Sequence, residues 1–136
     1  MNQETILLAE DNDDDVTMFQ IAFNRATLPH VLRVVPDGQE AIEWLQGAGK
    51  YADRQAYPMP ALLLTDIKMP RKNGFDVLQF VRETTAVAKL PVVILSSSDE
   101  PKDVKRAYDG GATTYFVKTP LFENVIHFIR TVTLPH

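Results

Sequence analysis

Five short runs of β-branched or aliphatic residues alternate along the chain with five longer stretches whose apolar residues recur at helical spacing. The predicted strands are Thr5–Ala9, Val31–Val35, Ala61–Thr65, Val92–Ser96 and Thr114–Val117. The predicted helices are, approximately, Asp14–Ala26, Gly38–Gln46, Gly74–Thr84, Pro101–Asp109 and Leu121–Thr133. Because a helix separates each strand from the next, the pattern predicts an α/β fold with a parallel sheet and helices on both faces.

The size of the chain is consistent with one domain of this class. A chain of 136 residues buries roughly 68% of the surface that its unfolded form exposes, so it needs no disulfide or structural metal. We therefore expect a single domain over residues 1–136, with no effector domain. The chain has no cysteine, which excludes a disulfide scaffold, a thiolate zinc site and a cysteine nucleophile.

Charge and hydropathy narrow the expected partners and location. The net charge is −4 and the basic residues form no stripe, so we expect no direct contact with nucleic acid. No apolar run approaches the ~20 residues of a membrane-spanning helix, and the N-terminal segment MNQETILLAEDN has no basic leader. These features predict a cytoplasmic protein without a membrane contact.

One connection is longer than is usual in such folds, the irregular stretch from Gly47 to Pro60. It is either a surface loop pinned by Tyr51 and Tyr57 or a dedicated partner contact. Surface loops tolerate insertions readily, which favours the first interpretation.

Polar side chains follow four of the predicted strands. Glu10 and Asp11 follow the first, Asp66 the third, Ser96 to Ser98 end the fourth, and Lys118 follows the fifth. Ligands of such sheets bind at the carboxyl ends of the strands, so these groups are expected to converge on one rim. Crowded carboxylates raise one another's pKa unless a cation lies among them, and an all-oxygen donor set suits Mg²⁺.

These residues, in this order, resemble the receiver domain of two-component response regulators. The resemblance rests on Glu10-Asp11, on Asp66-Ile67-Lys68-Met69-Pro70 with Gly74, and on Ser96-Ser97, Tyr115 and Lys118, and it covers about residues 5–132. The segments ILLAEDNDDDV, Tyr51-Ala52-Asp53 and TVTLP are similar in particular to stand-alone regulators paired with phytochrome-type histidine kinases. The resemblance implies a five-stranded sheet in the flavodoxin-like order 2-1-3-4-5.

The resemblance also implies a phosphorylation switch rather than an ordinary enzyme. Asp66 would accept a phosphoryl group from a histidine kinase, and Mg²⁺ would be held by Glu10, Asp11, Asp66 and the backbone carbonyl of Lys68. Lys118 would bind a phosphoryl oxygen. The signal would pass to a downstream protein target or a phosphotransfer protein, and the protein would be a monomer or a weak homodimer.

Two residues would convert phosphorylation into a change of the outer surface. Ser96 would donate its hydroxyl to the phosphoryl group, and Tyr115 would move between exposed and buried positions. The alternative for Tyr115 is an ordinary aromatic residue at a strand end. Ser97 and Ser98 are equally compatible with phosphate contacts and with hydrogen bonds inside the loop.

Two further expectations concern the surface around this site. The first predicted helix has more apolar residues than packing requires, so Met18 or Phe19 would either dock the kinase or extend the core contact. Lys68 would set the lifetime of the phosphorylated state if its side chain lay against the phosphoryl oxygens or paired with Glu10. The alternative is that the Lys68 side chain points away into solvent.

Two departures from the family pattern stand near the C-terminus. Family members usually have Pro directly after the lysine, whereas Thr119 separates Lys118 from Pro120. A cis bond before a residue other than proline costs ~2.5–4 kcal/mol, so either strain or another loop geometry is expected. The last predicted helix is also short, so it offers only a small surface for a dimer.

Two other functions compete with the switch. A haloacid-dehalogenase-type phosphatase would have a second Asp two residues after the nucleophile, but that residue is Lys68. A receiver-like module that binds partners without accepting phosphate is the other alternative, and the intact acidic set is evidence against it.

Overall fold

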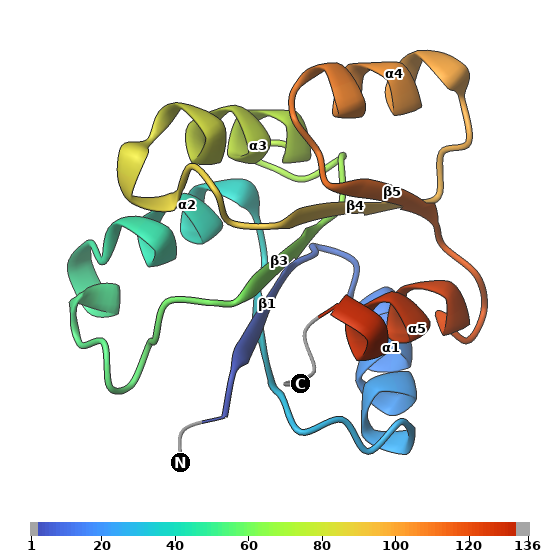
Figure 1. The fold of residues 1–136 in the computed structure, drawn as a ribbon, viewed down its shortest axis with the longest axis horizontal. Coiled ribbons are helices and arrows are strands. Elements are labelled where there is room, and N and C mark those ends of the chain that lie inside the picture. Colours follow the sequence, from blue (N-terminus) through green and yellow to red (C-terminus); the bar gives the residue numbers. More distant parts are fainter. Residues whose placement is uncertain (1–2, 133–136) are drawn as a thin grey trace.

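The computed structural model describes residues 3–132 and has a parallel sheet of five strands at its centre (Figure 1). The strands are β1 (Thr5–Ala9), β2 (Val31–Val35), β3 (Leu62–Thr65), β4 (Val92–Ser96) and β5 (Thr114–Val117). Their order in the sheet is β2-β1-β3-β4-β5, and every neighbouring pair is parallel. The predicted α/β class and strand order are therefore confirmed.

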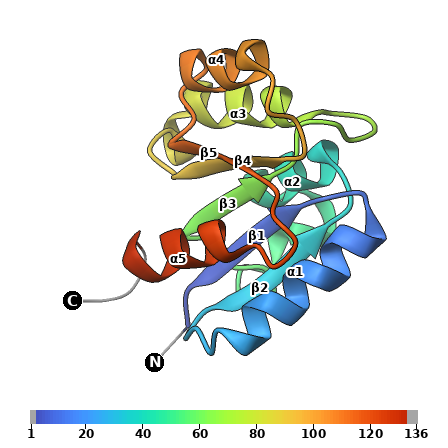
Figure 2. The ribbon, with the colours of Figure 1, turned by 90° about the vertical axis from the view of Figure 1, so that its right-hand side faces the viewer.

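Five α-helices cover the two faces of the sheet. They are α1 (Asp13–Arg25), α2 (Gly38–Gln46), α3 (Gly74–Glu83), α4 (Pro101–Asp109) and α5 (Glu123–Val132). Figure 2 shows α1 and α5 on one side of the sheet and α3 and α4 on the other, and α2 lies beside α3. Within residues 3–132, no helix has the length and apolar character needed to cross a membrane.

The strands alternate their side chains between two apolar layers, because successive residues of a strand point to opposite faces. Leu7 and Ala9 of β1 pack in the cluster that contains the buried residues of α2 and α3. Ile6 and Leu8 pack in the cluster that contains the buried residues of α1 and α5. Both faces are thus covered, which explains the nearly continuous apolar sequence of the central strands.

Most differences from the predicted elements lie at helix ends and follow from local capping. Helix α1 begins at Asp13 rather than Asp14, because the Asn12 side chain caps it by accepting from the Asp15 amide at 2.9 Å. Helix α5 begins at Glu123 rather than Leu121, since Phe122 has a φ of 52°, outside the right-handed helical region. The predicted last residue, Thr133, lies outside the described residues.

The long connection after α2 folds back on that helix. It contains a short 3₁₀ helix, η1 (Gly49–Ala52), and the turns that follow it, neither of which was predicted. A second unpredicted 3₁₀ helix, η2 (Thr85–Val87), lies elsewhere in the chain, after α3. Tyr51 is buried, and the rings of Tyr51 and Tyr57 each lie about 5 Å from the Trp44 ring. The indole of Trp44 also donates to the Pro58 carbonyl at 2.9 Å. The two tyrosines therefore pin this segment, as the first interpretation predicted.

Candidate functional site

Three carboxylates meet at the carboxyl ends of β1 and β3. Oxygen atoms of Glu10, Asp11 and Asp66 lie within 4.8 Å of one another. The two strand ends are joined directly, because the amide of Asp66 donates to the Ala9 carbonyl at 3.1 Å. All the donors are hard oxygen atoms on a partly open rim, so the set fits a cation such as Mg²⁺ that retains several waters.

Lys118 neutralises part of this cluster. Its Nζ donates to Glu10 Oε1 at 2.8 Å, to Asp15 Oδ2 at 2.7 Å and to Asp66 Oδ2 at 2.9 Å. Burial alone would lower the pKa of Lys118, but the hydrogen bonds to Asp15, Glu10 and Asp66 raise it, so the ammonium stays charged. The structure therefore brings two of the predicted carboxylates, Glu10 and Asp66, together with the predicted lysine around one hydrogen-bonding centre.

Asp15 is the member of this cluster that the sequence reasoning missed. By sequence it is one of three acidic residues in the first turn of α1, where a negative charge interacts favourably with the helix dipole. Its side chain instead reaches Lys118, which lies 103 positions later in the chain. The run Asp13-Asp14-Asp15 offered the signal of an acidic cluster, but only the helical turn decides which carboxylate faces the lysine.

Glu10 carries the strongest electrostatic perturbation among the carboxylates of the site. It is buried, and burial raises its pKa to about 7, with the Asp66 charge adding to the rise and Lys118 opposing it. Its second oxygen, Oε2, accepts from the Asn12 amide at 3.1 Å. The remaining excess of negative charge is a physical reason for a cation to bind beside Glu10 and Asp66.

The backbone holds Asp66 at the end of β3. The Ile67 amide donates to Asp66 Oδ1 at 2.6 Å, and the Thr65 hydroxyl donates to the Asp66 carbonyl at 2.9 Å. The Gly74 amide donates to the Ile67 carbonyl at 2.8 Å, which draws the first turn of α3 against the same segment. A Cβ atom at position 74 would overlap the carbonyl oxygen of Asp66, so only glycine permits this approach.

We expect Gly74→Ala to destabilise the protein by about 2 kcal/mol, because the added methyl group meets rigid backbone. The displaced Asp66 should also react more slowly with small phosphodonors. Urea unfolding measures the first effect. Gly110→Ala is the matched control, since its closest contact would be the flexible end of the Leu78 side chain at 3.0 Å, and the nearest backbone atom, the Arg106 carbonyl oxygen, lies 3.3 Å away. Equal losses of stability in the two variants would contradict the steric explanation.

Ser96 and Tyr115 lie beside this cluster on β4 and β5. Ser96 is buried, and its Oγ accepts from the Ser98 amide at 3.1 Å. The Tyr115 hydroxyl donates to the Ser98 carbonyl at 2.7 Å, and burial raises its pKa. Tyr115 is therefore half-buried and turned toward the loop after β4, while its movement on phosphorylation remains a prediction.

The other serines of this loop differ from each other. The Ser98 hydroxyl donates to Asp103 Oδ2 at 2.7 Å, so Ser98 takes the loop hydrogen-bonding role. Ser97 is exposed. Of the two alternatives weighed for these residues, the structure supports the internal hydrogen bond for Ser98.

Lys68 is exposed and lines an open depression with Asp11 and Arg106. The suggested pair between Lys68 and Glu10 is wrong, because Glu10 is paired with Lys118 and Lys68 forms no salt bridge with any residue in the range 3–132. The Lys118–Thr119 bond is trans, as are the other peptide bonds of the described chain. The interposed threonine is thus accommodated by loop geometry.

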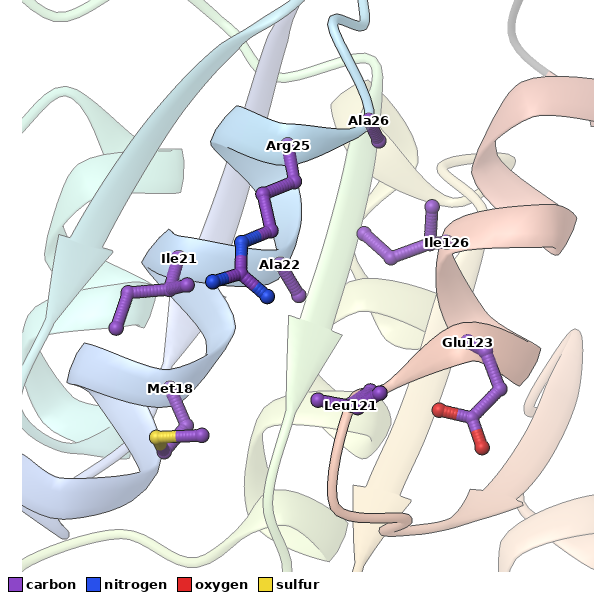
Figure 3. Close-up of a pocket in the computed structure, with 8 residues that line it drawn as sticks. All are labelled: Met18, Ile21, Ala22, Arg25, Ala26, Leu121, Glu123 and Ile126. Carbon is purple, nitrogen blue, oxygen red and sulfur yellow. The ribbon is translucent and has the colours of Figure 1, made fainter.

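A shallow, mainly apolar groove lies between α1 and α5 (Figure 3). It has a volume of about 360 Å³ and is lined by residues that include Met18, Ile21 and Leu121, of which Figure 3 shows Leu121 extending from the start of α5 toward α1. Met18 is 41% exposed, whereas Phe19 is 1% exposed and packs against the Phe122 ring. The suggestion that Phe19 docks a partner is therefore wrong, because the helical turn directs it into the core.

The strand order, the acidic cluster at the carboxyl edge and the lysine that reaches into it define a receiver-type domain. The chain belongs to the response regulator receiver domain family, whose sequence model matches residues 6–130. The predicted family is confirmed, and the haloacid-dehalogenase alternative is not supported.

Particular relatives point to the same group that the sequence resembles. The chain is 30% identical over 140 residues to response regulator Rcp1 of Synechocystis, with 97% of this chain and 93% of Rcp1 covered. It is similar to the solved structure of the phosphorylated cyanobacterial phytochrome response regulator RcpA, at a TM-score of 0.87, 33% identity and coverage of 99% and 100%. It is also similar to the Mn²⁺-bound form of Rcp1, at a TM-score of 0.85, 32% identity and coverage of 98% and 99%.

Proposed function

We propose that this protein is a single-domain response regulator that accepts a phosphoryl group on Asp66 and signals by protein contact. The observation that carries the proposal is the position of Asp66, whose carboxylate lies within 4.8 Å of those of Glu10 and Asp11 and also accepts from Lys118 Nζ at 2.9 Å. Family membership and the phosphorylated relative RcpA support it.

The proposed reaction moves a phosphoryl group from a kinase phosphohistidine to the carboxylate. A carboxylate oxygen of Asp66 forms a bond to phosphorus as the phosphorus–nitrogen bond breaks, and the released imidazole takes a proton from solvent. Glu10, Asp11, Asp66 and the Lys68 carbonyl are the proposed ligands of Mg²⁺, which supplies charge neutralisation at the phosphoryl oxygens when bound. The Mn²⁺-bound form of Rcp1 supports a divalent ion in such a site.

The proposed switch then exchanges hydrogen bonds at the rim. Lys118 gives up its bond to Asp66 Oδ2 and donates to a phosphoryl oxygen. Ser96 gives its hydroxyl to the same group, which draws the loop after β4 inward. Tyr115, now bonded to the Ser98 carbonyl of that loop, changes its position with it.

The proposed partner is a histidine kinase of the phytochrome type, on the strength of the phytochrome-linked relative. The kinase is proposed to contact the groove between α1 and α5 through Met18, Ile21 and Leu121. A phosphotransfer protein or another downstream protein would receive the signal. We further propose a cytoplasmic location and a monomeric or weakly dimeric state.

Acetyl phosphate provides the test of the proposed function. Intact mass should show one added phosphoryl group in the presence of Mg²⁺ and none when the ion is chelated. The same experiment separates the alternatives, because a module that binds partners without accepting phosphate gains no mass under either condition. An addition that is independent of Mg²⁺ would contradict the proposed metal ligands.

We expect Lys68 to change the lifetime of the phosphorylated state by only a few-fold, because an exposed charge interacts by about 0–1 kcal/mol. Its side chain lines a depression together with Asp11, and a cation there would obstruct the in-line approach of water to the phosphoryl group. The measurement is autodephosphorylation of the parent, Lys68→Asn and Lys68→Ala at fixed Mg²⁺ and ionic strength. Equal rates in all three would restrict Lys68 to its backbone carbonyl.

The proposed contact at the groove between α1 and α5 leads to a separate prediction about phosphotransfer from the kinase. Ile21→Asp should lower phosphotransfer from the cognate kinase by roughly tenfold, as expected for a moderate interface hot spot. Labelling by acetyl phosphate should stay at the parent rate, because Ile21 is 40% exposed and lies outside the acidic cluster. Phosphotransfer is measured against the host's histidine kinases, with the exposed Gln20→Asp on the same helix as control. Parent-like transfer to Ile21→Asp would place the docking surface elsewhere.

A further inference from the structure

The loop from Ile67 to Asn73, which leaves the acidic cluster, is attached to a second element. Arg71 donates from Nε to Asp37 Oδ2 at 3.0 Å and from Nη2 to Asp37 Oδ1 at 3.1 Å. The Gly38 amide donates to the Lys72 carbonyl at 3.1 Å. The tip of this loop is therefore bound by side chain and backbone to the start of α2.

Two local features of the chain are required for this attachment. Arg71 has a φ of 66°, in the left-handed region that a residue with a Cβ rarely adopts. A Cβ at position 38 would overlap the carbonyl of Lys72, so the start of α2 approaches this closely only because the residue is glycine. The contact thus holds an unfavourable backbone conformation in place, as is typical of functional loops.

Asp37 is a rigid anchor for the arginine. It is buried, and it caps α2 by accepting from the Glu40 amide at 2.8 Å. Burial opposes its ionisation, but hydrogen bonds from Arg71 and from that amide lower its pKa below the ordinary value, so it stays charged. Glu40 adds a second carboxylate, 3.9 Å from Arg71 Nη2. A bidentate pair to a fixed carboxylate restrains the position and the orientation of the guanidinium.

Because of this attachment, the loop is held at both ends and only a short segment lies between the two held ends. At one end, Asp66 directly follows β3 and the Ile67 carbonyl accepts from the Gly74 amide. At the other end, Arg71 and Lys72 are held on α2. Lys68, Met69 and Pro70 bridge these points, so the direction of the Lys68 carbonyl depends on both of them.

We propose that Asp37 and Arg71 are positioning residues that hold the Lys68 carbonyl in the orientation that binds the divalent ion. This inference rests on the proposed function, which assigns that carbonyl to the metal site. Without the pair, the loop samples other conformations, and the ion must order it on binding. The affinity for the ion should therefore fall although every proposed ligand is still present.

The test is the binding of Mn²⁺ alone to the unphosphorylated protein, followed by the electron paramagnetic resonance signal of the free ion. Arg71→Ala and Asp37→Asn should each weaken Mn²⁺ binding by roughly fivefold, somewhat below the effect of removing a direct partner of a metal ligand. Asn at position 37 still caps α2, so this variant separates the ion pair from the helix cap. Arg71→Lys should recover part of the affinity, because lysine keeps the charge but not the bidentate geometry.

Lys89→Ala is the matched control for the loss of one exposed positive charge. Lys89 precedes β4, at the opposite end of the sheet from the acidic cluster, and the variant should bind Mn²⁺ like the parent. The double variant Asp37→Asn/Arg71→Ala should bind no more weakly than Arg71→Ala, because the two residues act as one unit.

Thermal melts identify the folded variants before these comparisons are made. Parent-like Mn²⁺ affinity in folded Arg71→Ala and Asp37→Asn would overturn the positioning role while leaving the metal site intact. A parent protein that binds no Mn²⁺ would instead overturn the metal assignment in the proposed function, and the positioning role with it.

Discussion

Asp66→Asn is expected to fold normally and to gain no phosphoryl group from acetyl phosphate at any Mg²⁺ concentration. The amide has the shape of the carboxylate but not its nucleophilic oxygen, so the bond to phosphorus does not form. Asp66 directly follows the central strand β3, and its carboxylate lies close to the acidic pair and to Lys118. Intact mass after treatment measures the effect, which should be complete rather than partial.

The fold should tolerate this change because Lys118 keeps two other carboxylate partners, Glu10 and Asp15. Asp99→Asn is the matched control, since Asp99 is exposed and follows β4 at the same edge of the sheet. It should be labelled like the parent. Mg²⁺-dependent labelling that persists in Asp66→Asn would show that another residue is the acceptor.

Asp11→Ala should reduce labelling by acetyl phosphate to background and leave stability nearly unchanged. Asp11 is exposed, and its side chain makes no hydrogen bond or salt bridge with any residue that the structure describes. Its removal should therefore shift the free energy of unfolding by no more than about 0.5 kcal/mol. Its oxygen atoms nevertheless lie with those of Glu10 and Asp66, so the proposed Mg²⁺ site loses a ligand.

Asp14→Ala controls for the loss of one negative charge from the same acidic run. Asp14 is exposed in the first turn of α1 and is not one of the three clustered carboxylates. The control should keep the parent rate of labelling, and urea unfolding should show both variants folded. If Asp11→Ala is labelled at the parent rate, Asp11 is not a ligand of the metal that phosphorylation needs.

The strands could be predicted closely because their signal is local. Runs such as LLL and VVIL bounded by turn residues identify β3 and β4 wherever the rest of the chain lies. Helix ends were less accurate, since they depend on single backbone conformations. Phe122, with its positive φ, delays α5, and no hydrophobic pattern reports that angle.

The residues of the site also fall into those that the sequence could predict and those that it could not. Glu10, Asp66 and Lys118 each follow a strand of a parallel sheet, so their meeting at one edge follows from topology. Asp15 belongs to a helix, and its contact with Lys118 depends on how far α1 has turned and how it packs. The same holds for Met18 and Phe19, adjacent in sequence but exposed and buried respectively.

The sequence by itself determined the class of fold, the strand order through the family that it resembles, and the strand ends that carry polar groups, because each depends on local pattern and chain connectivity. Only the tertiary structure decided that Asp15 completes the shell of Lys118, that Phe19 is part of the core, and that Arg71 joins the loop after Asp66 to Asp37. These contacts join segments far apart in the chain, and their distances depend on the packing of every helix on the sheet at once. No stretch of sequence read alone contains that information.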